Sequence, residues 1–388
     1  MAGTSIQLQF STYHKLFTFL FFKLVFIAIA FSQQAVSNVP SSQKNIFAVS
    51  AGINTGFVIV HTRDVQFTKG SRPVGIELSA SWQRNDSATL NVCNCYPRKG
   101  VVINYFNMGN EKLGKIYNAG FFLEPTYKIG RHVFFSFRAV LGAAYGTRPY
   151  DSIRNPINRA YSTHMNAFLM LGTGLYFRMN DHLWLHTSLN FNHVSNGGMH
   201  LPNKGIDWPT VGITLSYQKH PTTYFTGKRI KSMAWKNNSI RWDATVFGIV
   251  NKIVDENKKE HFFPLVGVEF SGSKQIGNLN ALTLGTEIFT DPGHALDVKI
   301  KNFVSASPVR AGLLFGHEFL LGKFIFSQRI GFYYFSQMPY DRFYHRWTIT
   351  YRMNNHWGVG ASLLAHRQVA NFFNAKVTYS WQKRNGIH

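Results

Sequence analysis

The sequence contains few charged residues, and the acidic ones are the scarcer kind. Only 15% of the 388 residues are charged, against about 25% in an ordinary soluble domain. Asp and Glu together number 18 and Lys and Arg 41, which gives a net charge of +23. No Lys/Arg-rich run or nucleic-acid-binding motif accompanies this charge. It therefore favours attraction to anionic lipid headgroups over nucleic acid binding.

Long apolar runs are also missing beyond the N-terminal segment. The mean hydropathy is −0.12, and the body of the chain lacks the uninterrupted stretches of roughly 20 apolar residues that membrane-spanning helices need. These features argue against a multi-helix membrane protein. The hydrophobic share of 45% and the low charge argue equally against a disordered chain.

Cysteine is limited to Cys93 and Cys95. Two residues apart on a β-strand, their Cα atoms would lie about 7 Å apart, which is poor geometry for a disulfide. A lone Cys-x-Cys is also a weak metal-binding signal. We assign the pair no function from the sequence.

The N-terminus has the pattern of an export signal. Lys15 precedes the apolar stretch Leu16–Phe31, and small residues in an Ala-x-Ser pattern follow. Lys23 interrupts the stretch, which weakens the alternative of a permanent helical anchor. We predict a signal peptide over residues 1–37 and export of the rest of the chain.

The chain after residue 37 has the pattern of short β-strands separated by turns that contain Gly, Asn, Asp and Pro. Residues 183–195, 210–218 and 373–381 alternate apolar with mostly polar side chains. A soluble sheet would show the same alternation. Export, the aromatic share of 15% and the low charge favour an all-β, antiparallel transmembrane β-barrel with its apolar side chains facing lipid.

An internal repeat divides this β region into two halves. Residues 135–138 (FSFR) match 326–329 (FSQR), and residues 178–182 (RMNDH) match 352–356 (RMNNH) in the same order. An ordered series of this kind indicates duplication.

The repeat predicts a first half over residues 38–219, a linker over 220–238 and a second half over 239–388. Each half has room for about eight strands of barrel length. Two tandem eight-stranded barrels and one larger barrel of about sixteen strands both fit the sequence.

The candidate site begins at the C-terminal end of the strand 183–195. His193 and Ser195, two residues apart, share one face, so a neutral imidazole there can take the proton of the hydroxyl. Asp207 opens the next strand, and a hairpin return would place it beside His193 to orient the ring. Asn196 and the amides of the Gly197-Gly198 pair follow the serine directly as donors for an oxyanion. Polar side chains on an apolar outer face are costly unless they have a purpose.

These residues resemble a known family. His193-Val194-Ser195-Asn196-Gly197-Gly198, followed by Pro202-Asn203-Lys204-Gly205-Ile206-Asp207, is similar to the motif of the outer-membrane lipid A 3-O-deacylases, the PagL-like acyloxyacyl hydrolases. The resemblance covers roughly residues 40–219. It implies that this half is an eight-stranded barrel in the outer membrane of a Gram-negative bacterium.

The resemblance also implies a role for each site residue. Ser195 is the nucleophile, His193 the general base and Asp207 the acid that orients it. The oxyanion donors are Asn196 and Gly198, and Asn203 supports the loop. The implied reaction removes a 3-O-linked hydroxyacyl chain from lipid A, the membrane anchor of lipopolysaccharide, and needs neither a metal nor another cofactor.

Several alternatives stay open. An outer-membrane phospholipase A also uses His-x-Ser-Asn-Gly, with an Asn as third member and with calcium, and a non-enzymatic porin or scaffold could retain the motif. Lys204 and His200 are candidates for contact with lipid A phosphates. The sequence does not decide the oligomeric state, and a homodimer is one of the states it allows.

The second half departs from the motif. His366 is followed by Arg367 and Gln368 where Ser is needed, and the Pro-Asn-x-Gly-Ile loop is absent. We predict that this half is catalytically inactive.

Overall fold

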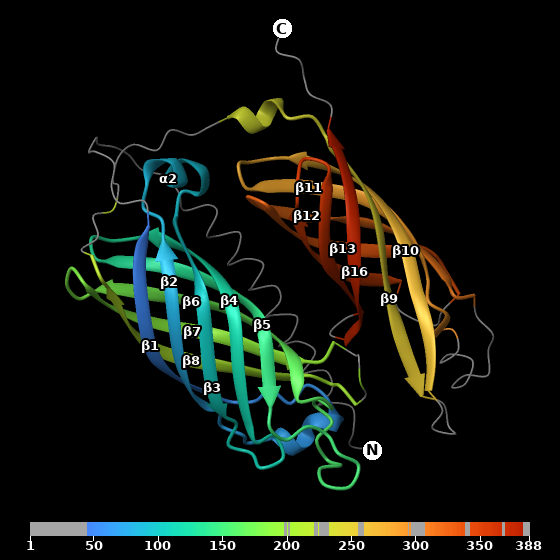
Figure 1. The fold of residues 1–388 in the computed structure, drawn as a ribbon, viewed down its shortest axis with the longest axis horizontal. Helices are drawn as coiled ribbons and strands as arrows, with labels where there is room; N and C mark the ends of the chain where they lie inside the picture. Colours follow the sequence, from blue (N-terminus) through green and yellow to red (C-terminus); the bar gives the residue numbers. More distant parts are fainter. Residues whose placement is uncertain are drawn as a thin grey trace, which may run out of the picture.

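The computed structural model describes residues 45–197, 200, 202–220, 224, 233–254, 260–293, 295, 307–337, 342–366 and 369–382. Its strands form two closed antiparallel barrels of eight strands each. The two barrels lie side by side in Figure 1, the first in blue to green and the second in yellow to red. The predicted all-β barrel fold is therefore confirmed, and of the two arrangements that fit the sequence the tandem one is present. The predicted signal peptide, residues 1–37, lies outside the described residues.

Each strand pairs with its neighbours in the chain, and the last strand of each barrel closes on the first. The first barrel consists of β1 (Ile46–Gly56), β2 (Val74–Gln83), β3 (Tyr96–Asn107), β4 (Lys115–Lys128), β5 (Val133–Gly146), β6 (Met165–Arg178), β7 (Leu183–Ser195) and β8 (Ile206–Gln218). The second consists of β9 (Arg241–Val254), β10 (Glu260–Gln275), β11 (Asn280–Thr290), β12 (Val309–Leu321), β13 (Phe324–Ser336), β14 (Phe343–Arg352), β15 (Trp357–His366) and β16 (Val369–Gln382).

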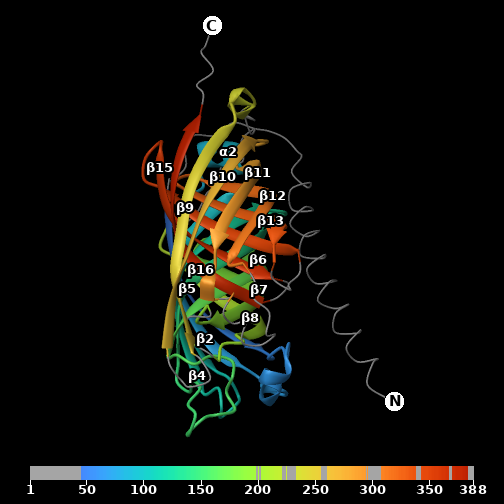
Figure 2. The same cartoon turned by 90° about the vertical axis from the view of Figure 1, so that its right-hand side faces the viewer.

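Helices are short and lie outside the barrel walls. The 3-10 helix η1 (Arg63–Thr68) connects β1 to β2, the α-helix α2 (Ser87–Cys93) connects β2 to β3, and the 3-10 helix η2 (Ala234–Asn237) precedes β9. In Figures 1 and 2, η1 (blue) and α2 lie at opposite ends of the first barrel. Within the described residues, no helix has both the length and the apolar character to cross a bilayer.

The alternation along each strand separates an apolar outer surface from a polar lumen. On β8, Val211, Ile213 and Leu215 point outward and are each more than half exposed, while Thr214 and Ser216 are buried in the lumen. Exposed apolar side chains on strand after strand suit contact with lipid, and barrel closure satisfies the backbone groups that hydrocarbon cannot.

Buried ion pairs fill both lumens at equivalent positions. In the first barrel, Arg138 of β5 donates to Glu77 of β2 across 2.6 Å. In the second barrel, Arg329 of β13 pairs with Glu269 of β10. β5 and β13 are the fifth strands of their barrels and β2 and β10 the second. Eight strands leave an interior just wide enough for side chains to fill, and these ion pairs occupy part of that interior.

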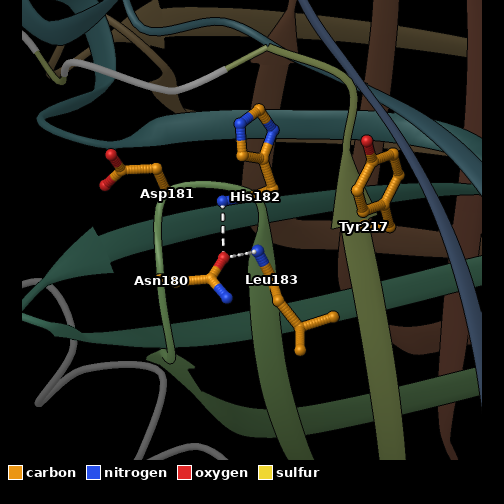
Figure 3. Close-up of a pocket in the computed structure, with 5 residues that line it drawn as sticks. All are labelled: Asn180, Asp181, His182, Leu183 and Tyr217. Carbon is orange, nitrogen blue, oxygen red and sulfur yellow. Dashed lines mark hydrogen bonds between the residues drawn. The ribbon is translucent and has the colours of Figure 1, made fainter.

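The repeated turn confirms this strand-for-strand correspondence. Between β6 and β7, Asn180 Oδ1 accepts hydrogen bonds from the backbone N–H groups of His182 and Leu183 (Figure 3). Between β14 and β15, Asn354 Oδ1 accepts the same pair of bonds from His356 and Trp357. Beside the first turn is an open hollow of about 590 Å³, lined by Asn180, Asp181, His182, Leu183 and Tyr217.

The cysteine pair is where the sequence interpretation is wrong. Cys93 and Cys95 form a disulfide, with their Cα atoms 5.1 Å apart. Cys93 is the last residue of α2 and not part of a strand, and Asn94 adopts a left-handed conformation with φ 56°. This tight turn brings the two Cα atoms closer than an extended strand would allow.

Candidate active site

The end of β7 and the start of β8 bring three predicted site residues together. His193 pairs directly with Asp207 in the register of the two strands, and Ser195 lies two residues further on the same face. The His193 Nδ1 atom is 2.6 Å from Asp207 Oδ1, and its Nε2 atom is 3.1 Å from Ser195 Oγ. The ring thus donates from Nδ1 to the carboxylate and accepts the serine proton at Nε2, which is the geometry of a Ser-His-acid triad.

This group sits on the outer wall of the barrel and not in its lumen. Along β7 the even-numbered residues from Trp184 to Val194 are buried inside, whereas the odd-numbered ones, Leu189 and His193 among them, face outward. The side chain of His193 is 35% exposed and that of Asp207 17%. Ser195 is also at an odd-numbered, outward-facing position of β7. It is nevertheless only 7% exposed, because the segment leading into β8 lies against it.

Gly205 is the residue of that segment that touches the triad. Its φ of +73° favours glycine, and a Cβ atom at this position would lie 2.8 Å from His193 Cε1. A side chain larger than hydrogen would therefore press on the imidazole ring. The close approach lets the segment cover Ser195 while the His193–Ser195 contact is kept.

The predicted oxyanion and support residues form the turn after the serine. Asn203 Oδ1 accepts a hydrogen bond from the Asn196 backbone N–H at 3.0 Å. The Asn196 side-chain amide donates to the His200 carbonyl at 2.8 Å and to Ser162 Oγ at 3.2 Å. Asn203 therefore lies where a loop support is expected. The Asn196 N–H must give up its bond to Asn203 before it can donate to an oxyanion, and Gly198 lies outside the described residues.

A second histidine, His61, which no sequence motif singled out, lies on the far side of the Asp207 carboxylate. The segment after β1 crosses the start of β8, where the Ile59 N–H donates to the Asp207 carbonyl at 2.9 Å. Two residues on, His61 Nδ1 is 3.5 Å from Asp207 Oδ2. His61 Nε2 is 3.0 Å from the Lys204 carbonyl oxygen, and the His61 side chain is only 10% exposed.

Ion pairs between three charged side chains connect the segment after β1 to the loops that carry Arg159 and Lys204. Arg159 and Lys204 both contact Asp64 of η1, at 3.1 Å and 3.2 Å. The hydrogen bonds from Arg159 and Lys204 hold the pKa of the Asp64 carboxyl below its usual range. Lys204 is therefore engaged with Asp64, and any contact between Lys204 and a lipid phosphate would compete with that pair.

The equivalent place in the second barrel is built differently. His366 is the last residue of β15, and His193 lies two residues before the end of β7. His366 is on the inward-facing side of β15, together with Ser362 and Leu364, so it points into the lumen. There it is 8% exposed and stacks on Tyr333. Its Nδ1 atom lies 2.7 Å from Asn371 Oδ1, an amide where the first barrel has a carboxylate. Arg367 and Gln368 lie outside the described residues.

The second barrel nevertheless contacts the turn after Ser195. Gly197 has a φ of +67°, and a side chain there would collide with the ring of Phe373 on β16. At the opposite end, the Asn278 amide lies 3.5 Å from the Val92 carbonyl oxygen of α2. Within the described residues, no cluster of three or more His, Cys, Asp or Glu side chains is placed to hold a metal ion.

Two family models match the chain, one for each barrel. Residues 74–218 match the model described as lipid A 3-O-deacylase (PagL), and residues 240–383 match that of the acyloxyacyl hydrolase C-terminal domain. The chain belongs to the PagL-like acyloxyacyl hydrolase family. Its place in this hydrolase family, together with the barrel fold, assigns it to the outer membrane.

Among solved structures, this PagL-like chain is similar to other barrels. Neisserial surface protein A is 11% identical with a TM-score of 0.30, over 46% of this chain and 99% of that one. A de novo designed transmembrane β-barrel is 13% identical with a TM-score of 0.26, over 46% and 99%. The translocator domain of autotransporter NalP from Neisseria meningitidis is 7% identical with a TM-score of 0.21, over 96% and 97%. No curated protein matches the chain.

Proposed function

We propose that the first barrel is a serine esterase that removes the 3-O-linked hydroxyacyl chain of lipid A in the outer membrane. The observation that carries this proposal is the contact of one imidazole with a hydroxyl at 3.1 Å and a carboxylate at 2.6 Å on the apolar outer wall. A lipid ester at the membrane boundary reaches such a wall without leaving the bilayer. The match to the lipid A 3-O-deacylase model supports this choice of ester.

The reaction follows from the roles that this geometry allows. His193 Nε2 takes the proton of Ser195 Oγ as that oxygen attacks the ester carbonyl carbon. Asp207, on the other ring nitrogen, stabilises the imidazolium that forms. The tetrahedral intermediate then expels the sugar oxygen, which receives the proton from His193. Water, activated by the same imidazole, releases the hydroxy fatty acid from Ser195 and restores the hydroxyl.

Backbone and side-chain amides of the turn after Ser195 are the candidate oxyanion donors. Asn196 and Gly198 retain this assignment as a prediction, with Asn203 holding the turn in shape. An oxyanion donor aimed at the developing charge commonly contributes 10²- to 10³-fold in rate.

Purified protein in detergent micelles tests the proposal and separates its rivals. With lipid A as substrate, mass spectrometry should detect a released 3-hydroxy fatty acid for the wild type and several orders of magnitude less for Ser195→Ala. Release of fatty acid from phospholipid, dependent on added calcium, would favour a phospholipase A instead. A folded barrel that releases neither product would support a scaffold or a porin, although ion pairs and aromatic rings occupy the described part of both lumens.

A further inference from the structure

The loop between β5 and β6, residues 147–164, lies against the turn between β7 and β8. The Arg159 carbonyl oxygen accepts a hydrogen bond from the Lys204 N–H at 3.0 Å. The Ala160 carbonyl oxygen accepts one from the Gly205 N–H at 2.8 Å. Gly205, the residue that contacts the imidazole ring of the triad, is therefore held through its backbone by this loop.

The loop is itself fixed by buried side chains. Asn158 Oδ1 accepts the Ala160 N–H at 3.0 Å, and Asn158 Nδ2 donates to the Arg148 carbonyl oxygen at 2.6 Å. The Tyr161 hydroxyl donates to the Leu113 carbonyl oxygen at 2.8 Å. Asn158 and Tyr161 are both fully buried. Because buried polar groups with satisfied hydrogen bonds make a structure rigid, the loop is a fixed support for the turn beside it.

Ser162 extends from this loop to the turn that follows Ser195. Its Oγ atom accepts a hydrogen bond from Asn196 Nδ2 at 3.2 Å and donates to the His200 carbonyl oxygen at 2.9 Å. Asn196 Nδ2 also donates to that carbonyl oxygen, at 2.8 Å. The hydroxyl thus acts as donor and acceptor at once, and the carbonyl oxygen uses both of its lone pairs. Asn196 is only 1% exposed, and this triangle of hydrogen bonds fixes its side-chain amide.

We propose that Ser162 is a positioning residue of the active site, which holds Asn196 in place to serve as an oxyanion donor. This inference rests on the proposed esterase function. Asn196 directly follows Ser195, so a shift of its side chain also shifts the backbone of the turn that carries the candidate donors. Such donors act only when they are aimed at the developing charge. Loss of the Ser162 contact should therefore slow the chemical step and leave substrate binding unchanged.

Two neighbouring hydroxyls of the loop separate this role from general loop stability. Ser162→Ala removes the contact with Asn196. The matched control is Thr163→Ala, because the Thr163 hydroxyl contacts the Met165 carbonyl oxygen at 2.8 Å and Asn166 Oδ1 at 3.1 Å, both in its own segment of the chain. Ser162→Thr keeps a hydroxyl at position 162 and serves as the conservative rescue.

The measurement is the rate at which a fluorophosphonate labels Ser195 of the full chain in detergent micelles. Ser195 Oγ bonds to phosphorus, fluoride leaves and His193 takes the hydroxyl proton, so the probe reports the site without requiring lipid A. Because misplacement of a catalytic group costs up to about 100-fold, we expect Ser162→Ala to react about 10- to 100-fold more slowly than the wild type. Thr163→Ala should match the wild type, and Ser162→Thr should recover most of the lost rate.

A double-mutant cycle tests whether Ser162 acts through Asn196. Once the Asn196 side chain is removed, its contact with Ser162 no longer exists, so Ser162→Ala should cost little further rate in the Asn196→Ala background. A general loss of loop structure would instead slow labelling by the same factor in both backgrounds. With lipid A as substrate, Ser162→Ala should lower kcat and leave KM unchanged.

The outcomes distinguish this inference from the function on which it rests. If Ser195 of the wild type is not labelled, the serine esterase proposal and this inference both fall. If the wild type is labelled but Ser162→Ala reacts as fast as Thr163→Ala, only the role of Ser162 is wrong. An equal loss in the two backgrounds, in variants that fold as judged by heat-modifiable gel mobility, would also overturn it. So would a folded Asn196→Ala variant that reacts at the wild-type rate, even if Ser162→Ala did not fold.

Discussion

Among single residues, the candidate triad depends on a hydrogen bond between two directly paired strand residues, His193 and Asp207. The cross-strand pair His193 and Asp207 needs no long loop to converge, because the register of β7 and β8 sets them opposite each other. An aspartate there reaches His193 Nδ1 at 2.6 Å. The short side chain is sufficient because the backbones are already adjacent.

Removing that carboxylate should reduce the rate without abolishing it. We expect Asp207→Ala to lower kcat on lipid A by about 10²- to 10⁴-fold, since the ring loses its tautomer and orientation but keeps its basic nitrogen. The loss should be smaller than for Ser195→Ala. Steady-state kinetics would measure it, with Asp181→Ala, at an exposed acid in the β6–β7 turn, as the control. A silent Asp207→Ala would show that the triad has another third member.

Gly205 offers a test of the contact over the imidazole ring. We expect Gly205→Ala to lower kcat by at least tenfold, because the new methyl group would displace the His193 ring, and misplacement of a catalytic group costs up to about 100-fold. The matched control is Gly322→Ala. Gly322 has nearly the same φ, +71°, but has no heavy atom within 4 Å of an added Cβ. Equal activity of the two variants would show that the contact of residue 205 with the His193 ring does not constrain the reaction.

At the scale of elements, the segment carrying η1 is the part of the fold that completes the site. Asp64 holds it to the loops through Arg159 and Lys204, and His61 extends from it to the acid. Sequence patterns could predict the triad because His193, Ser195 and Asp207 lie on one hairpin. They could not predict His61, since its contact joins the first strand connection to the last and depends on barrel closure.

The attachment of this segment should depend on pH in a defined direction. The pKa of Asp64 is lowered in the folded protein, so its contribution is present at neutral pH and is lost as the pH falls through the folded-state pKa. We expect Asp64→Asn to speed hydrogen exchange in residues 57–73 at neutral pH, and the difference from the wild type to disappear in acid. Asp181→Asn should leave exchange in this segment unchanged. A difference that persists in acid would contradict the role of the carboxylate.

The whole molecule consists of two barrels with the same strand order, and within the described residues the His-Ser-Asp group lies on the first barrel. The lumen ion pairs and the β6–β7 and β14–β15 turns are shared, whereas the outward-facing histidine is not. Alternation and the repeat were enough to predict two sets of eight strands. They could not separate two barrels from one, because the deciding pairs, β1 with β8 and β9 with β16, join residues far apart in the chain. The disulfide was missed for a local reason, since α2 stands where a strand was assumed.

The second barrel should influence the first through Phe373. Its ring packs on the Gly197 turn beside Ser195, so we expect Phe373→Ala to loosen that turn and raise KM for lipid A by roughly 3- to 10-fold, as the loss of one partly exposed apolar contact would. Phe315→Ala, at an outward-facing phenylalanine of β12 that is 59% exposed, should leave kinetics unchanged. Equal KM values for the two variants would show that the second barrel does not shape the site.

The mass of lipid A from cells producing this chain distinguishes an active deacylase from an inactive barrel. Wild-type protein should yield lipid A that lacks one 3-hydroxyacyl chain, and Ser195→Ala, present at the same level as a folded barrel, should leave lipid A intact. Unchanged lipid A with the wild type, or the same deacylated product with Ser195→Ala, would contradict the account of a serine nucleophile on the outer wall of the first barrel.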